Sequence, residues 1–247
     1  MSKMILIALS FCFITDSVVA QSTTAAKPDY SMYNNMFIKP KRGHEKQFEQ
    51  GVKAHNAAFH ASGPSKASLS IVTEGSRSDG WYIWGMGPLT YTDMDHMPQG
   101  DAKHDDDWDK NVDAHVEEYG ESNFWKLKDD LSYTPAGYNP SHLDVWVVDI
   151  KPGMRYLFAE LMKKNKAVWE AKKYPFSSRV FYNDLWSNTG RDASIVYNFD
   201  HYADFDMDIK FKEDFESVHG VGSYDNFWKS WNECVNGVDE HLRKILK

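Results

Sequence analysis

The densest run of residues that could do chemistry lies between Asp93 and Asp109. Carboxylates at this density can hold a hard cation such as calcium. However, the EF-hand spacing and the His-Glu-x-x-His motif are both absent from the sequence, and aspartates ahead of a helix stabilise its N-terminus by capping and through the helix dipole. We therefore interpret the run as a solvated, helix-capping loop and predict no metal site. Its acidic and histidine residues are Asp93, Asp95, His96, Asp101, His104, Asp105, Asp106, Asp107 and Asp109.

Two residues outside this run are candidates for acid–base catalysis. His55 lies on the apolar face of a predicted helix, where it could face a pocket or ligate a haem. A single histidine at such a position is more often structural, and its approximate counterpart in the second half of the chain is Asn165. Asp184 interrupts an apolar strand pattern. His55 and Asp184 are the residues to test as catalytic groups.

Other familiar catalytic arrangements are missing from the sequence. No Gly-rich phosphate loop follows a predicted strand, and the Gly-x-Ser-x-Gly elbow of serine hydrolases is absent. Cys234, the only cysteine outside the first 20 residues, lies in a predicted helix, which is a poor location for a nucleophile. The sequence therefore names no cofactor and leaves open whether the protein is an enzyme.

Aromatic and polar side chains within the predicted strands indicate a binding pocket. Aromatic residues make up 15% of the chain, including nine tryptophans, and aromatic walls with a few polar groups are typical of small-molecule sites. Polar residues in a half-buried strand face either water or a pocket, so the alternative is an aromatic core with exposed polar edges. The predicted ligand contacts are Tyr82, Trp84, Asn183, Trp186, Tyr197 and Asn198.

Residues 1–20 have the pattern of a secretory signal peptide. Lys3 supplies a positive charge, residues 4–14 form an apolar run, and Val18 and Ala20 place small side chains before a cleavage site. We therefore expect a secreted or periplasmic protein. No later stretch approaches the ~20 apolar residues of a membrane span, so we expect no membrane partner after cleavage. The net charge of −8, with no cluster of Lys and Arg, argues against nucleic acid as a partner.

The rest of the chain contains an internal repeat. Three short matches recur in the same order, pairing residues 38–40 with 150–152, 91–95 with 202–206, and 108–113 with 231–236. In the first copy, periodicity predicts strands at 33–39, 68–73, 81–86 and within 120–133, and helices at 48–59 and 106–119. In the second copy it predicts strands at 143–150, 179–186 and 193–199, helices at 154–173 and 224–242, and a last strand that is short or missing within 243–247.

The order β-α-β-β-α-β is that of a ferredoxin-like unit, and two such units in one chain resemble the dimeric α+β-barrel superfamily, which includes the antibiotic-biosynthesis monooxygenase-like domains. The resemblance covers most of residues 33–247. It implies an α+β fold in which two ferredoxin-like repeats pack their antiparallel sheets into an intramolecular barrel, a monomer being allowed because the duplication replaces a dimer. The predicted segments are a signal peptide (1–20), a flexible N-terminus (21–32), a first repeat (33–133), a linker (134–141) and a second repeat (142–247).

Two functions remain as hypotheses. The first is an exported barrel that binds a small apolar or aromatic molecule, as the aromatic content and the lack of a catalytic motif suggest. The second, implied by the resemblance, is a cofactor-independent monooxygenase-like or isomerase-like enzyme that acts on a small aromatic substrate. Fold resemblance alone does not decide between them.

Overall fold

The computed structural model describes residues 28–98, 100–185 and 188–247 of the chain. The predicted signal peptide (1–20), most of the predicted flexible N-terminus and the predicted ligand contact Trp186 lie outside these described residues. In the described part of the chain, no helix is long and apolar enough to cross a membrane.

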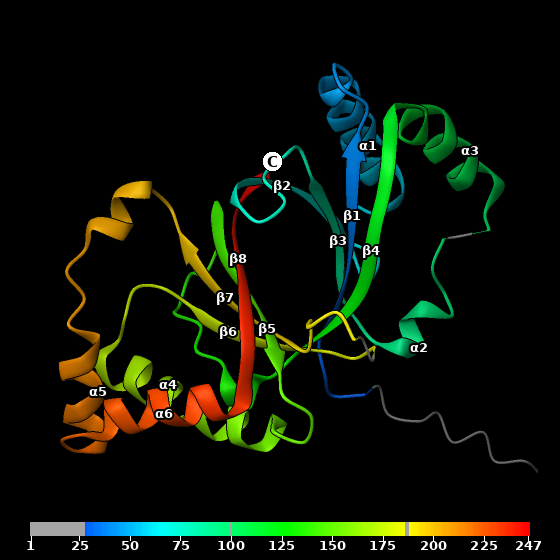
Figure 1. Cartoon of the computed structure of the whole chain (residues 1–247). Coiled ribbons are helices and arrows are strands. Elements are labelled where there is room, and N and C mark those ends of the chain that lie inside the picture. Colours follow the sequence, from blue (N-terminus) through cyan, green and yellow to red (C-terminus); the bar gives the residue numbers. More distant parts are fainter. Residues whose placement is uncertain (1–27, 99, 186–187) are drawn as a thin grey trace, which may run out of the picture.

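Eight antiparallel strands form one closed barrel (Figure 1). The strand order around it is β1-β3-β2-β8-β5-β7-β6-β4, and β4 pairs with β1 to close the ring. Closure leaves no open sheet edge. The strands are β1 (Met32–Pro40), β2 (Ala67–Gly75), β3 (Tyr82–Leu89), β4 (Val116–Leu127), β5 (His142–Ile150), β6 (Ser178–Asn183), β7 (Ala193–Phe199) and β8 (Val235–Leu246).

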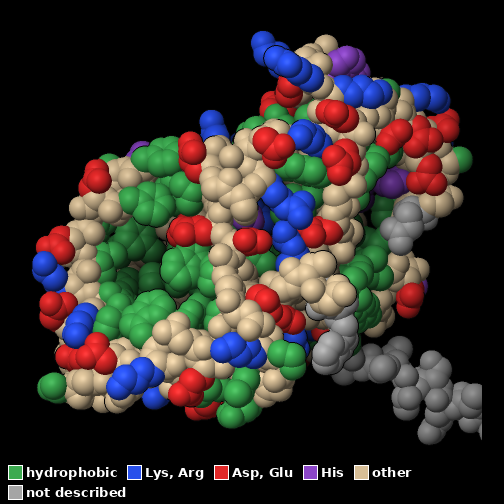
Figure 2. Space-filling view, viewed as in Figure 1, with side chains coloured by type: hydrophobic (Ala, Val, Ile, Leu, Met, Phe, Trp, Pro, Cys, Tyr) green, Lys and Arg blue, Asp and Glu red, His purple; other side chains and the backbone are tan. Residues whose placement is uncertain are grey.

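Helices cover the outside of the barrel in two groups (Figure 1). The first half contributes α1 (Glu45–Phe59), α2 (Tyr91–Met94) and α3 (Ala102–Asn111), and the second half contributes α4 (Arg155–Lys172), α5 (Phe211–His219) and α6 (Ser223–Cys234). Figure 2 shows that hydrophobic side chains line a hollow on the face between α5, α6 and β7. The helices and the barrel thus form two layers, with space between them in both halves.

The element order is the same in both halves of the chain. Each half runs strand, helix, two strands, helical segments and a final strand, and the local strand orders are β4-β1-β3-β2 and β8-β5-β7-β6. The halves join where β2 pairs with β8 and where β4 pairs with β6. The α+β class and the antiparallel barrel that were expected are therefore confirmed.

Two predicted helices are wrong at their C-terminal ends. The helix predicted at 106–119 ends at Asn111, and residues 116–127 form β4. The helix predicted at 224–242 ends at Cys234, and residues 235–246 form β8, where only a short strand was expected. Both errors have one cause: β4 and β8 each pair with two strands distant in sequence, and those ladders override the local helical spacing.

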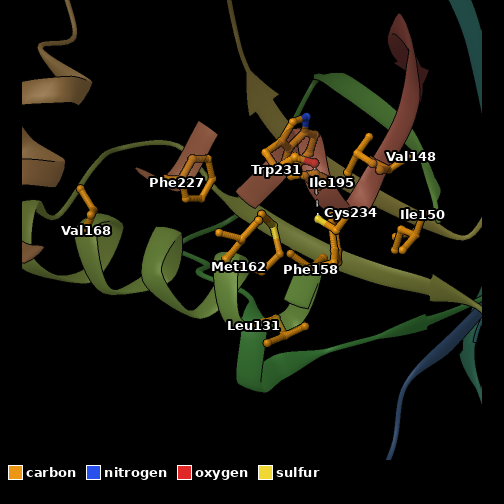
Figure 3. Close-up of a cluster of buried hydrophobic side chains, with 14 of the residues drawn as sticks. Leu131, Val148, Ile150, Phe158, Met162, Val168, Ile195, Phe227, Trp231 and Cys234 are labelled. Atoms are coloured by element: carbon orange, nitrogen blue, oxygen red, sulfur yellow. Dashed lines mark hydrogen bonds between the residues drawn. The ribbon is translucent and has the colours of Figure 1, made fainter. Parts of the chain in front are cut away.

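The largest core cluster lies between α4, α6 and the second half of the sheet (Figure 3). Phe158 and Val168 on α4 are fully buried and pack with Trp231 on α6. Cys234 is also fully buried, and its thiol lies 3.5 Å from the carbonyl oxygen of Trp231. This cysteine therefore packs as a small hydrophobic residue.

Candidate functional site

Three histidines converge between α1, α3 and the outer face of the barrel. His55 lies on the buried face of α1, His60 immediately follows that helix, and His104 lies in the first turn of α3. His55 is fully buried and His60 is 4% exposed. One ring nitrogen of each histidine lies within 4.8 Å of those of the other two. We call this cluster and its surroundings the histidine pocket.

The opposite nitrogen of each ring is held by an oxygen atom. Nδ1 of His55 lies 2.8 Å from Oδ2 of Asp107, and Nδ1 of His104 lies 2.8 Å from Oδ1 of Asp105. Nδ1 of His60 lies 2.8 Å from the carbonyl oxygen of Ser65. Carboxylate and carbonyl oxygens only accept hydrogen bonds, so each Nδ1 must donate. In a neutral imidazole this leaves Nε2 unprotonated, with its lone pair free.

The three Nε2 atoms therefore direct lone pairs into one place. Nε2 of His60 and Nε2 of His104 are 3.2 Å apart, and buried Nε2 of His55 has no hydrogen-bond partner among the described residues. Two acceptors at that separation repel each other unless a proton or a cation lies between them. Two ligands of a tetrahedral zinc ion, at 2.0–2.1 Å from the metal, lie about 3.3–3.4 Å apart. The observed separation is close to that value.

The histidine pocket has room beside the three rings. Its volume is about 300 Å³, and thioether and indole groups line it together with the histidines. Trp84 on β3 is fixed by a hydrogen bond from its Nε1 to Oδ1 of Asn56, 2.9 Å away. Burial lowers the pKa of both His55 and His60, partly offset by their hydrogen bonds to Asp107 and Ser65. The remaining lining residues include Met36, Met86, Met94 and Trp108.

Local sequence features position the two helices that carry the histidines. Asp101 caps α3 by accepting a hydrogen bond from the backbone N–H of Lys103 at 2.8 Å. Gly51 lets α1 approach the end of α3, because a Cβ at that position would lie 1.8 Å from the carbonyl oxygen of Asn111. The aspartates of the predicted capping loop thus divide their roles. Asp101 caps α3, whereas Asp105 and Asp107 orient histidines.

A second pocket lies at the corresponding place in the other half of the chain. It has a volume of about 310 Å³ between α4, α5, α6 and the sheet, and aromatic rings dominate its lining. Trp169 on α4 stacks on Tyr197 of β7, with ring centroids 5.6 Å apart. Both residues also line an adjoining cavity that Asp144 of β5 borders. We call the two adjoining cavities the aromatic pocket (Figure 2).

Asp144 is the buried carboxyl group that borders the aromatic pocket. Its side chain is 8% exposed, and Oδ1 has no hydrogen-bond partner among the described residues. Burial, together with the nearby carboxylate of Glu240, raises the pKa of Asp144 to about 7. A carboxyl group that titrates near neutral pH beside an apolar cavity can act as a general acid or base.

The structure divides the predicted site residues between these places. His55 and Trp84 line the histidine pocket, whereas Tyr197 and Asn198 line the aromatic pocket. The amide oxygen of Asn198 accepts a hydrogen bond from the backbone N–H of Ser177 at 2.6 Å. These four residues therefore do not form one site.

The other predicted residues hold the framework together. Tyr82 is buried and donates to Glu49 at 2.7 Å, and buried Asn183 donates to Oδ1 of Asn123 at 3.0 Å. Asp184 forms an ion pair with Lys126 at 2.8 Å and accepts from the hydroxyl of Tyr91 at 2.6 Å. Burial opposes ionisation of Asp184, but the contacts with Lys126 and Tyr91 lower its pKa on balance.

Sequence reasoning missed most of the residues that form the two pockets. His60 was not singled out, and His104 was read only as part of a capping loop. The sequence does contain a signal for a histidine cluster. His104 and Asp107 lie one turn apart on a short helix, and His55 and His60 lie near the end of another. Asp144 was not singled out either; in the structure it lines the aromatic pocket, whereas its neighbour Val145 lines the interior of the barrel.

Comparison with known proteins supports the fold. No protein-family model and no curated protein matches the chain. Among solved structures, a candidate monooxygenase from Fusobacterium nucleatum is similar with a TM-score of 0.55 at 11% identity, covering 88% of this chain and 93% of that one. A candidate monooxygenase from Lactobacillus acidophilus gives 0.54 at 11% identity, covering 88% and 94%. A mutant chlorite dismutase from Candidatus Nitrospira defluvii gives 0.52 at 9% identity, covering 89% and 93%.

These likenesses extend over nearly the whole described chain. The chain therefore has the fold of the dimeric α+β-barrel superfamily, that of antibiotic-biosynthesis monooxygenase-like and chlorite dismutase-like proteins. At such low identity the likeness defines the fold and assigns no residue a role.

Proposed function

We propose that this protein is an exported metalloprotein whose histidine pocket binds one transition-metal ion through Nε2 of His55, His60 and His104. One observation carries the proposal: each Nδ1 faces an oxygen that only accepts hydrogen bonds, so three lone pairs meet in one place. A metal-ligating histidine typically donates its other N–H to a carboxylate or a backbone carbonyl. All three histidines of this pocket have such a partner.

Three nitrogen ligands suit a reactive metal centre. Structural zinc sites use four protein ligands, whereas catalytic ones use three and keep a position for water or substrate. Imidazole suits zinc, copper, iron and nickel, and soft thioethers favour copper; three methionines line this pocket. The function we propose is metal-assisted conversion of a small, largely apolar molecule that enters beside Trp84 and Trp108.

Two further parts of the proposal rest on the sequence. Export is supported by the pattern of residues 1–20. A duplication that joined two ferredoxin-like repeats, and so replaced a dimer by one chain, is supported by the equal element order of the two halves. One of the three repeated motifs supports it too, because its copies 91–95 and 202–206 each follow closely after a strand and form a helical turn with a capping box that contains Asp93 or Asp204.

Metal titration of the purified full chain tests the metal site. After treatment with a chelator, we expect one equivalent of Zn²⁺ to bind per chain, and Co²⁺ to give the intense visible bands of a tetrahedral ion. His104→Ala should weaken zinc binding at least 100-fold. His44→Ala is the matched control, because His44 pairs with His115 outside the pocket and should leave affinity unchanged.

Either of two results would overturn the proposal. The first is a chain that binds no stoichiometric zinc, copper or cobalt. The second is equal loss of affinity in His104→Ala and His44→Ala, which would mean that binding is not specific to the pocket. Competition between Zn²⁺ and Cu⁺ then determines which metal the pocket prefers.

A second candidate function is supported by Asp144 and the aromatic pocket. Under this reading the pocket binds a small apolar or aromatic molecule, and Asp144 serves as the acid or base of a cofactor-independent reaction. The fluorescence of a neutral probe such as N-phenyl-1-naphthylamine should report binding, which Trp169→Ala weakens about tenfold and Trp108→Ala leaves unchanged. Equal effects of the two substitutions would contradict this reading.

A further inference from the structure

The interior of the barrel contains a cavity that neither function above uses. Its volume is about 270 Å³, and side chains from all eight strands line it. It lies on the opposite face of the sheet from the histidine pocket. On β1, Tyr33, Asn35 and Phe37 face the barrel cavity, whereas Asn34 and Met36 face the histidine pocket. The same strand therefore serves two different compartments.

Three arginines line the barrel cavity. Arg191 is 8% exposed, and its Nη1 forms an ion pair with Glu121 at 3.1 Å. Arg243 is equally buried and Arg179 is partly buried. Among the residues that the structure describes, neither Arg179 nor Arg243 forms an ion pair with a carboxylate. The cavity thus contains two cations without a counter-ion.

Neutral groups hold both of these arginines in place. Nε of Arg243 donates to Nε2 of His241 at 2.8 Å. Burial, and then the charge of Arg243, lower the pKa of His241 to about 2, so this histidine is neutral and accepts. The guanidinium of Arg179 lies 5.1 Å from the ring centroid of Phe181 and 5.2 Å from that of Tyr138. Such contacts orient a guanidinium but do not neutralise it.

One buried and one partly buried cation without a counter-ion are unfavourable in a folded protein. The chain has eight more acidic than basic residues, yet none of the described carboxylates neutralises this pair. A bound anion would do so. The rest of the cavity wall is largely apolar, with Val145, Val147 and Ile245 among its members, which suits an organic body better than a bare inorganic ion.

We propose that the barrel cavity binds a small organic carboxylate, with its carboxylate group on Arg243, its apolar body against the strands, and the charge of Arg179 adding to the attraction. Guanidinium groups bind planar carboxylates through two parallel hydrogen bonds, which adds geometric selectivity to charge. This site is independent of the histidine pocket, because no residue is shared between the linings of the two cavities.

Calorimetric titration of the purified full chain with benzoate, neutral benzamide and inorganic phosphate tests this proposal. We expect benzoate to bind at least tenfold more tightly than either of the other two. Arg243→Met should abolish that preference, whereas Arg42→Met, at an exposed position, should keep it. Should Arg243→Met fail to fold, Arg179→Gln and the wild-type comparison of benzoate with benzamide still decide the matter.

Three results would overturn the proposal. They are no binding of benzoate at millimolar concentration, equal binding of benzamide or phosphate, and an unchanged benzoate preference in Arg243→Met. The two proposals, the metal site and the carboxylate site, can also be tested independently of each other. His104→Ala should lose zinc and keep benzoate, and Arg243→Met should lose benzoate and keep zinc.

Discussion

The two halves of the molecule place a pocket at the same point of the same topology but fill it with different chemistry. In the first half, α1 and α3 supply imidazoles and carboxylates, and in the second half, α4, α5 and α6 supply aromatic rings. His55 and its approximate counterpart Asn165 are both buried on the inner helix. His55 is held by Asp107 and leaves a nitrogen free, whereas the amide oxygen of Asn165 accepts from Trp169 at 3.2 Å.

This difference shows that the fold decides where a pocket lies but not which chemical groups line it. A helix packed on a sheet directs one side chain into the space between them, whichever residue the sequence supplies. With His55, nearby acceptors fix the tautomer and create a ligand. With Asn165, the amide group is hydrogen-bonded to Trp169 and Ser178. It therefore offers no free ligand atom to the pocket, whose remaining lining is mainly aromatic. The substitutions below test whether the two pockets differ in chemistry alone.

The largest expected effect comes from the packing that both halves share. Phe48 on α1 and Phe158 on α4 are each fully buried between helix and sheet. Replacing either with Ala should lower the free energy of unfolding by about 3–5 kcal/mol. Because β2–β8 and β4–β6 pairing joins the halves, urea denaturation should show one transition in both variants. Two separate transitions would mean that the halves are independent domains.

The next effect should be confined to the first half. In Gly51→Ala the new methyl group would collide with the carbonyl oxygen of Asn111 and force α3 away from α1. We expect a loss of about 3 kcal/mol, the upper end for overpacking, and a loss of zinc affinity. Binding of the neutral probe in the aromatic pocket should stay unchanged. A variant that binds zinc normally would show that α3 tolerates the shift.

In the second half, a pH-dependent effect should come from the buried carboxyl group of Asp144. Asp144 has its folded pKa raised to about 7 by burial and by Glu240, above the unfolded value of ~3.9. The neutral acid therefore stabilises the fold below pH ~4, and this contribution is lost as pH rises toward 7. Asp144→Asn should gain stability relative to wild type over that interval, by up to about 1.4 kcal/mol for each pH unit.

The measurement is chemical denaturation of both proteins at several pH values from 4 to 8. A stability difference that is constant with pH would contradict the raised pKa of Asp144. Glu240→Gln should reduce the same pH dependence, because it removes the neighbouring charge.

The smallest expected effect is on zinc affinity and comes from Asp107, which contacts the proposed ligand His55. Asp107→Asn should weaken zinc binding 10- to 100-fold, because the carboxylate orients His55 and increases its basicity. Asp106→Asn is the matched control on the same helix, since Asp106 pairs only with exposed Lys110 at 3.0 Å among the contacts described. Isothermal titration with zinc distinguishes the two. Equal affinities would show that Asp107 has no role in binding.

Much of the fold could be predicted because its signals are local. The alternation of residues 193–199 predicted a strand whose bounds are those of β7, and the helical spacing of 154–173 predicted α4 within one residue at each end. The strands β4 and β8 were mostly missed because their identity depends on partners far along the chain. Val235 pairs with Ile150, and Gly75 pairs with His241. No window of sequence contains both members of such a pair.

The candidate site was predicted only in part, for the same reason. His55 could be named because its position on the apolar face of a helix is a local property. His104 lies 49 residues later, and only the packing of α3 on α1 brings the two rings to a centroid distance of 4.7 Å. The sequence pattern also predicted Asp184 and Asn183 as site residues, but in the structure, at the end of β6, they form an ion pair and a hydrogen bond with β4.

The sequence by itself determined the order of elements, the α+β class and the faces that the helices bury, since these follow from periods of two and 3.6 residues. Only the tertiary structure decided which buried polar groups meet. Whether a histidine becomes a ligand depends on what lies against its second nitrogen, and whether an arginine has a counter-ion depends on the opposite wall of the barrel. The histidine contacts depend on how α3 packs on α1, and the surroundings of the arginines depend on which strands face one another across the barrel.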